Sequence, residues 1–451
     1  MRLDFLSFIP SFGGFLWTVV FFVVALSIIV AIHEYGHYIV GRWSGIHADV
    51  FSVGFGPVLW SRHDRRGTRW QIAALPFGGY VKFAGDANAA SGKDEEAMAE
   101  AVTDPEKLRR TMHGAPLWAR AATVSAGPIF NFILSTLVFA AIALNSGQVS
   151  DPVAIGELVP LPVEDRGLVE GDVLLEINGA TVPSLESGAY SDFFTALPLQ
   201  ERMIFKVRRD GAEIEVEDTY PRPPRITDVM PQSAAIAAGL AVDDVIREID
   251  GNPVFAFAQL KEAVETSDGK VLDLTVWRGG EDMKFELAPK RVDTPRAEGG
   301  FETVWRIGIA SGSSFEPATE TLGMGAALMN GVSRTGDIIE SSISGLWHII
   351  IGDIGACNLS GPVGIAQVSG QMASQGALNF VVFIAVLSTA VGLLNLFPIP
   401  ALDGGHLVFY AFEAVSGRPP SDKALRILMT VGLTMVLSLM VFALYNDIRC
   451  P

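Results

Sequence analysis

The sequence predicts a polytopic α-helical membrane protein with four transmembrane helices and two compact β-rich domains. Its 451 residues are 49% hydrophobic and have a mean hydropathy of +0.35. The chain is therefore too apolar for an ordinary soluble protein, yet too charged to lie wholly in a bilayer. Four apolar stretches approach the length that a hydrocarbon core of about 30 Å requires. They are residues 15–40, 118–144, 380–397 and 427–445.

The distribution of charge predicts how the spans are oriented. Residues 146–378 contain 17 Lys and Arg against 35 Asp and Glu, a net charge of −18, whereas residues 41–120 contain 11 against 9, a net charge of +2. The short loop between the last two spans is also basic, with Arg418, Lys423 and Arg426. By the positive-inside rule we expect both basic loops in the cytoplasm and the acidic centre outside, with both termini.

The first apolar stretch is expected to remain in the protein as a span. Its apolar run is longer than that of a signal peptide, and no A-x-A-like cleavage site precedes Arg42.

Residues 50–83 predict a β-hairpin. Two β-rich runs, VFSVGFGPVLW and TRWQIAALPFGGYVKF, flank the charged turn SRHDRRG. Gly78, Gly79 and their apolar neighbours indicate that this hairpin lies at or in the membrane surface.

An internal repeat defines the central segment. GLVEGDVLLEINGATV at residues 167–182 aligns with GLAVDDVIREIDGNPV at residues 239–254, an offset of 72 residues. Each copy has strand signals and a turn, at Asn178-Gly179 or Asp250-Gly251. Two copies are too few for a solenoid, so we expect two compact domains separated by the proline-rich linker 221–224. The predicted divisions of the chain are residues 1–150, 151–221, 222–292 and 293–451, and residues 314–376 are expected to form amphipathic helices on the membrane.

The first span carries a motif of metal chemistry, His33-Glu34-Tyr35-Gly36-His37. Residues four apart share a face of a helix, so both imidazoles can point at one metal ion. Glu34 is turned about 100° from His33 and can reach a water molecule at that metal. Ionisable side chains near the end of an apolar helix are costly and mark functional sites.

A catalytic zinc site usually takes three protein ligands. The candidates for the third ligand are Asp403 and His406. They lie in NLFPIPALDGGH at the cytoplasmic end of the third span, where two prolines break the helix. The remaining histidines are expected on the surface or on the outer side; they are His47, His63, His113 and His348. The two cysteines, Cys357 and Cys450, exclude a thiolate cluster and leave open either one disulfide or two free thiols.

These segments together resemble the site-2 protease family of intramembrane zinc metalloproteases. HEYGH matches the family's H-E-x-x-H, and NLFPIPALDGG matches its N-x-x-P-x-P-x-L-D-G. The segments GFGPVLWSRHDRRGT and FGGYVKFAGD resemble its membrane re-entrant β-hairpin, and the repeats resemble the PDZ domains of bacterial envelope proteases. GPIFNF and GPVGIA resemble motifs of the second span and of the approach to the third.

The resemblance implies a catalytic site. It assigns Asp403 as the third ligand of one Zn²⁺ per chain, with His33 and His37, and Glu34 as the general base. It also implies that Asn395 binds substrate backbone. An unwound substrate needs backbone partners, and we expect the strand with Gly78, Gly79, Tyr80 and Val81 to supply them.

The same resemblance implies the setting of the reaction. The substrates would be single-span membrane proteins, such as an anti-sigma factor, already trimmed by another protease. The chain would lie in the bacterial inner membrane, with the PDZ-like domains in the periplasm and the active site towards the cytoplasm; no nucleic acid is expected as a partner.

Two other classes of function compete with a protease. A transporter or metal channel also uses broken helices and buried carboxylates, but it needs no base such as Glu34. A membrane-tethered PDZ scaffold with a dead active site would have lost motif residues, and all of them are present in this sequence.

Overall fold

The computed structural model describes residues 15–87, 92–163, 165–185, 189–296 and 300–449, and divides the chain into two compact units. Unit 1 comprises residues 1–142, 325–350 and 356–451, and unit 2 comprises residues 143–324 and 351–355. Four helices in the described residues are long and apolar enough to cross a membrane, as the sequence predicts. They are α1 (Phe15–Trp43), α4 (Leu117–Ser146), α10 (Ala377–Leu396) and α12 (Asp422–Arg449).

Unit 1 is built around α1, which contacts α10, α9 and a pair of long strands. Close approach requires glycines at several contacts, because a Cβ on Gly36 would lie 2.5 Å from the Ala126 carbonyl oxygen of α4. Helix α8 packs on α4 in the same way at Gly331. The remaining elements of this unit are β1 (Ala48–His63), β2 (Arg69–Phe83), α2 (Glu95–Ala101), α3 (Pro105–Arg109), α8 (Met324–Ile351), the 3₁₀ turn η2 (Ala356–Asn358), α9 (Pro362–Ser374) and α11 (Asp403–Ser416).

The predicted hairpin is formed by two long antiparallel strands, β1 and β2. They fold back so that different parts of the same two strands pair side by side. Residues 50–53 of β1 pair with residues 69–72 of β2 on one side and with residues 79–82 on the other. Residues 60–63 of β1 pair with residues 69–72 from the far side. Residues 79–83 therefore form an edge whose outer side pairs with no strand among the described residues.

Unit 2 repeats one topology twice, which explains the 72-residue offset. The sheets β6-β5-β7-β8 and β11-β10-β12-β13 have the same order, and β5 (Val173–Ile177) stands 72 residues before β10 (Val245–Ile249). Both predicted turns take positive φ, at Asn178 (48°) and Asp250 (51°) and at the glycines that follow. The other elements of these two sheets are β6 (Ala180–Thr181), β7 (Arg202–Arg209), β8 (Ala212–Thr219), β11 (Asn252–Pro253), β12 (Leu272–Arg278) and β13 (Glu281–Leu287).

Each sheet of unit 2 has its own core and its own short companion sheet. A buried aspartate in each repeat pairs with an arginine on a neighbouring strand, Asp172 with Arg209 and Asp244 with Arg278. The strand β16 pairs with β9 in the second repeat, and β17 pairs with β4 in the first. The elements that accompany the two sheets are β3 (Gln148–Val149), β4 (Ile155–Leu158), α5 (Tyr190–Ala196), β9 (Ile226–Val229), α6 (Ala234–Ala238), α7 (Phe257–Glu265), β14 (Lys290–Pro295), β15 (Phe301–Arg306), β16 (Ile309–Ser311), β17 (Phe315–Pro317) and β18 (Thr319–Glu320).

The end of unit 2 differs from the boundary that the sequence predicts at residue 292. Residues 301–320 contribute four strands to this unit, and the helices begin only at Met324. The reason is pairing: β17 returns to β4, a partner about 160 residues earlier, and such long-range pairing leaves no local signal.

Candidate metal centre

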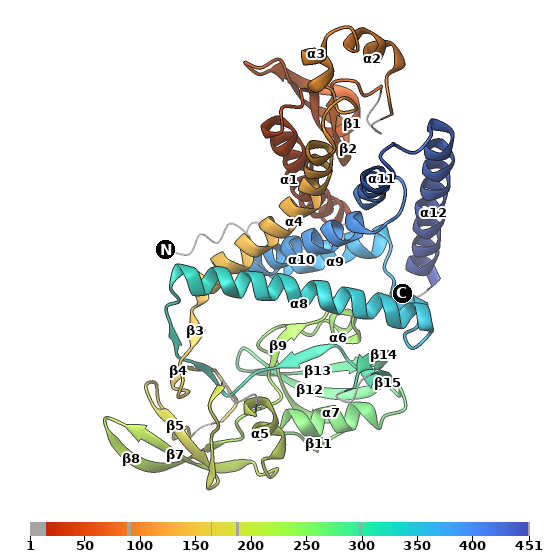
Figure 1. Ribbon diagram of the computed structural model, residues 1–451. Helices are drawn as coiled ribbons and strands as arrows, with labels where there is room; N and C mark the ends of the chain where they lie inside the picture. Colours follow the sequence, from red (N-terminus) through yellow and green to blue (C-terminus); the bar gives the residue numbers. More distant parts are fainter. Residues whose placement is uncertain (1–14, 88–91, 164, 186–188, 297–299, 450–451) are drawn as a thin grey trace. The chain divides into compact units, whose positions relative to one another are not determined.

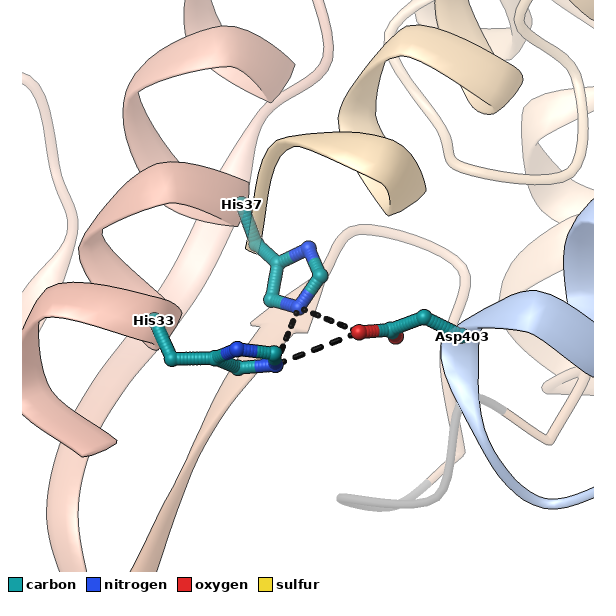
Figure 2. A group of neighbouring side chains, drawn as sticks. All are labelled: His33, His37 and Asp403. Atoms are coloured by element: carbon teal, nitrogen blue, oxygen red, sulfur yellow. Dashed lines mark hydrogen bonds and ion pairs between the residues drawn. The ribbon is translucent and has the colours of Figure 1, made fainter. Parts of the chain in front are cut away.

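Three side chains from two helices converge in unit 1 (Figure 2). His33 and His37 extend from successive turns of α1, and Asp403 extends from the first turn of α11. The two Nε2 atoms are 3.2 Å apart, and Oδ2 of Asp403 lies 3.2 Å from Nε2 of His33 and 3.5 Å from Nε2 of His37. Of the His, Cys, Asp and Glu side chains in the described residues, these three alone form a group able to hold a metal ion.

The donor set fits a tetrahedral zinc ion. Nδ1 of His37 lies 2.9 Å from the carbonyl oxygen of Thr123, so it carries the proton and leaves Nε2 with a lone pair. Three lone-pair atoms thus face one another, and Asp403 Oδ2 is buried without a hydrogen-bond donor. Two ligands of a tetrahedral zinc with bonds of about 2.0–2.1 Å stand roughly 3.3 Å apart, which matches the three distances.

Helix α4 supplies the partners of both imidazoles. The carbonyl oxygen of Thr123 accepts a hydrogen bond from Nδ1–H of His37, and the fully buried side-chain amide of Asn131 lies 3.2 Å from Nδ1 of His33. Oδ1 of Asn131 is buried with no partner. A rotation of this amide by 180° about χ2 would let Oδ1 accept a hydrogen bond from Nδ1–H of His33. A metal-bound histidine typically donates its second N–H in this way.

Gly127 allows α4 to approach the two histidines. A Cβ at this position would lie 2.4 Å from Nε2 of His37 and 2.8 Å from Cε1 of His33. The segment GPIFNF, predicted only to resemble a motif of the second span, places Gly127 and Asn131 four residues apart on one face of the helix. A small and a polar residue at that spacing within an apolar span could have predicted that this face of the helix is turned towards the site.

Glu34 faces the free edge of β2. The backbone of Val81 lies near its carboxylate, and a Cβ on Gly79 would lie 3.1 Å from its Cγ. The structure therefore brings Glu34, Gly79 and Val81 together. Gly78 adjoins them at a positive φ of 155°. The ring of Tyr80 instead stacks on Phe55, and its hydroxyl accepts a hydrogen bond from Gln71 within the hairpin.

Other predicted residues lie apart from the three ligands. The Asn395 side chain donates to the Val391 carbonyl oxygen of its own helix, α10, at 3.0 Å. His406 is one turn after Asp403, but it is not part of the ligand group. Burial lowers the pKa of the His406 imidazole, against the opposing effect of the Asp403 carboxylate.

Histidines and cysteines elsewhere in the described residues belong to no metal-binding group. His47 pairs with Asp49, His113 with the buried Asp86, and the half-buried His348 contacts the Ser344 carbonyl oxygen. Cys357 is disulfide-bonded, and the other cysteine of the sequence, Cys450, lies outside the described residues.

Comparison with known proteins agrees with this geometry. The sequence pattern of Peptidase family M50 matches residues 21–439. A protein of Agrobacterium fabrum named as a zinc metalloprotease is 35% identical over 436 residues, covering 95% of this chain and 94% of the relative. A similarly named protein of Rhizobium meliloti is 36% identical, covering 96% of each chain. The regulator of sigma-E protease of Salmonella typhimurium is 30% identical over 96% of this chain and 98% of its own.

The family match includes α4 and α10 entirely, most of α1 and α12, the histidine motif on α1 and Asp403. The predicted resemblance is thereby confirmed, and the four apolar helices agree with a multi-pass protein of the inner membrane. The chain belongs to Peptidase family M50, the site-2 proteases, and is a membrane-bound zinc metalloendopeptidase.

Proposed function

We propose that this protease hydrolyses peptide bonds in or near the transmembrane segments of single-span membrane proteins. One zinc ion per chain would be held by His33, His37 and Asp403. The observation that carries the proposal is the convergence of three lone-pair atoms, from α1 and α11, beside a carboxylate that faces an unpaired strand edge.

The side chains around the metal position have separate tasks. A zinc ion held by His33, His37 and Asp403 would polarise the scissile carbonyl group and would lower the pKa of water towards about 7. Glu34 takes a proton from the attacking water molecule and passes it to the nitrogen of the departing amine. Thr123 and Asn131 fix the orientations of the two imidazoles, so the ligands need no rearrangement when substrate arrives.

The edge formed by residues 79–83 is suited to bind an unwound substrate. A helical substrate must lose its internal hydrogen bonds before hydrolysis, and in an apolar surrounding its backbone groups then need new partners. A substrate strand added to this edge would find them by β-augmentation. Because Gly79 and Val81 flank Glu34, the strand would pass directly over the general base.

Asn395 is a further candidate to bind substrate backbone. Its side-chain amide nitrogen donates a hydrogen bond to the Val391 carbonyl oxygen. Contact with substrate therefore requires the side-chain oxygen or a rotation about χ1. The polar group lies one turn before the proline-containing segment that leads to Asp403.

Unit 2 is proposed to lie in the periplasm and to restrict which substrates reach the membrane. Its two repeats would exclude proteins with bulky folded exteriors and admit those already trimmed by another protease. A groove between α7 and residues 306–309 offers a second means of selection, since it is lined by apolar side chains and by Arg306 and Lys261.

The substitution Glu34→Gln tests the proposed chemistry. It preserves the shape of the side chain but removes the base, so the purified variant should bind zinc as the parent does and should cleave a trimmed single-span substrate at least 100-fold more slowly, since general-base catalysis contributes about 10²–10⁴-fold. A metal carrier would hardly respond to this change. Undiminished cleavage by the variant would refute the assignment of Glu34.

A further inference from the structure

A partly buried ion pair joins α4 to α11. The guanidinium of Arg120 donates from Nη1 to Oε2 of Glu413 at 2.9 Å and from Nη2 to Oε1 at 2.6 Å. The exposed fractions of the two side chains are 14% and 18%. Nε of Arg120 donates to the Ala115 carbonyl oxygen at 3.0 Å, and the guanidinium lies 5.1 Å from the ring centre of Tyr410. This bidentate arrangement fixes the distance and the angle between the two side chains.

Near Glu413, one face of helix α11 is exposed. Three of its apolar side chains point away from the rest of the unit; Val408, Phe412 and Val415 are 49%, 50% and 92% exposed. The backbone of the segment that leads into the helix is strained, because Ala401 takes a φ of +87°. A non-glycine residue in that region keeps its conformation only when its surroundings enforce it.

The other helix of the pair, α4, already positions the two histidines. Thr123, which binds His37, stands one turn after Arg120, and Asn131, which contacts His33, lies further along the same helix. One helix thus touches two ligands directly, and through Arg120 it holds the helix that carries the third.

We propose that Arg120 and Glu413 are positioning residues that set Asp403 against His33 and His37. The proposal rests on the zinc ligation proposed above. Glu413 is ten residues after Asp403 on a continuous helix, a distance of about 15 Å at 1.5 Å per residue, so the pair lies too far from Asp403 to contact the proposed metal. Without the pair, α11 is free to tilt about its entry segment, and Oδ2 of Asp403 moves relative to the two Nε2 atoms.

The affinity for zinc provides the direct test. The full-length chain in detergent would be titrated against a zinc chelator of known affinity, for the parent, Arg120→Gln, Glu413→Gln and the charge exchange Arg120→Glu with Glu413→Arg. We expect each single variant to bind zinc about 10- to 100-fold more weakly, the range seen when a residue that supports a metal ligand is removed. The charge exchange should recover part of that loss, because it restores an ion pair between the helices.

Arg42→Gln is the matched control. Arg42 also forms a partly buried ion pair in unit 1, with Asp64 at 3.4 Å, and its side chain is 18% exposed. That pair joins α1 to the hairpin turn and does not involve α11, so this variant should keep the parent's zinc affinity. Thermal unfolding of the metal-free proteins should show losses of similar size in the control and in Arg120→Gln.

Three results would overturn the proposal. One is a zinc affinity within twofold of the parent's in both single variants. Another is a charge exchange that binds zinc no better than the single variants, which would reduce the pair to general stability. If Arg120→Gln does not fold, Arg120→Lys, which keeps the charge, takes its place. The third result is a zinc affinity of Arg120→Lys equal to the parent's, which would contradict the need for bidentate geometry. A parent chain that binds no zinc would refute the metal site itself.

Discussion

At the scale of single residues, Asp403 and His406 are the two candidates that the sequence leaves open for the third ligand. Both lie within one short segment rich in proline and glycine, residues 395–406, and both are common zinc ligands. The structure separates them by direction: the Asp403 carboxylate points at the two imidazoles, whereas His406 contacts the ring of Phe409.

Substitution of the two residues should reproduce that separation. Asp403→Ala removes the proposed third ligand and is expected to lower the zinc content of the purified protein well below that of the parent and to abolish cleavage. His406→Ala should keep zinc, because its ring is outside the ligand group. Metal analysis by mass spectrometry decides the matter, and a full complement of zinc in Asp403→Ala would move the third ligand elsewhere.

At the scale of elements, the contact of α1 with α4 depends on the absence of side chains. Gly36 and Gly127 each meet the opposite helix at distances that a Cβ does not tolerate. Small residues serve this purpose in membrane helices because they let backbones approach closely. At this contact the approach also brings Thr123 and Asn131 to the histidines.

Gly127→Ala should therefore impair zinc binding. The added methyl group would lie within 3 Å of both imidazoles, so either the rings rotate or the helices separate. The matched control is Gly336→Ala in α8, where a Cβ meets nothing within 4 Å. There the change should be neutral or stabilise the protein by up to about 1 kcal/mol, the difference in helix propensity. Equal zinc affinities in the two variants would contradict this account of the helix contact.

At the scale of the whole molecule, the distribution of charge predicts that the hairpin turn and the loop between α11 and α12 face the cytoplasm. Single cysteines at Arg65, Arg418 and Glu281, all exposed positions, would be introduced into a chain whose two cysteines are replaced. An impermeant thiol reagent added to spheroplasts should label only the cysteine at Glu281. Labelling at Arg65 from outside would overturn the charge argument.

Removal of unit 2 tests its proposed role as a filter. The strands β3 and β18 are paired, with Val149 opposite Thr319, so residues 150–318 can be replaced by a short glycine-rich turn without separating the flanking chain ends. We expect the shortened protein to cleave a trimmed substrate as the parent does and to cleave an untrimmed one that the parent rejects.

The competing role for unit 2 predicts the opposite result. If the groove beside α7 must capture a newly exposed C-terminus before cleavage, the shortened protein should lose activity on the trimmed substrate as well. Comparison of both substrates with both proteins in detergent distinguishes the two roles. The deletion must reach residue 318, because β16 and β17 pair with strands near the start of each repeat.

Many structural features of this protein can be predicted from short segments of its sequence. The four spans follow from the length of apolar runs, the repeat from an offset that reappears between β5 and β10, and the turns from Asn-Gly and Asp-Gly pairs. His33 and His37 follow from helical periodicity, because residues four apart on one helix must share a face. Each of these features depends on neighbours within one element.

The remaining features depend on contacts between distant segments, which only the tertiary structure decides. The proximity of Asp403 to the two histidines requires the start of α11 to meet α1, and the contact of Asn131 with His33 requires α4 to pack at Gly127. The return of β17 to β4 and the pairing of Arg120 with Glu413 join residues about 160 and 293 positions apart. A polar residue in a span is costly to leave unpaired, so the sequence predicts that it has a partner. Which residue that partner is depends on how the helices pack.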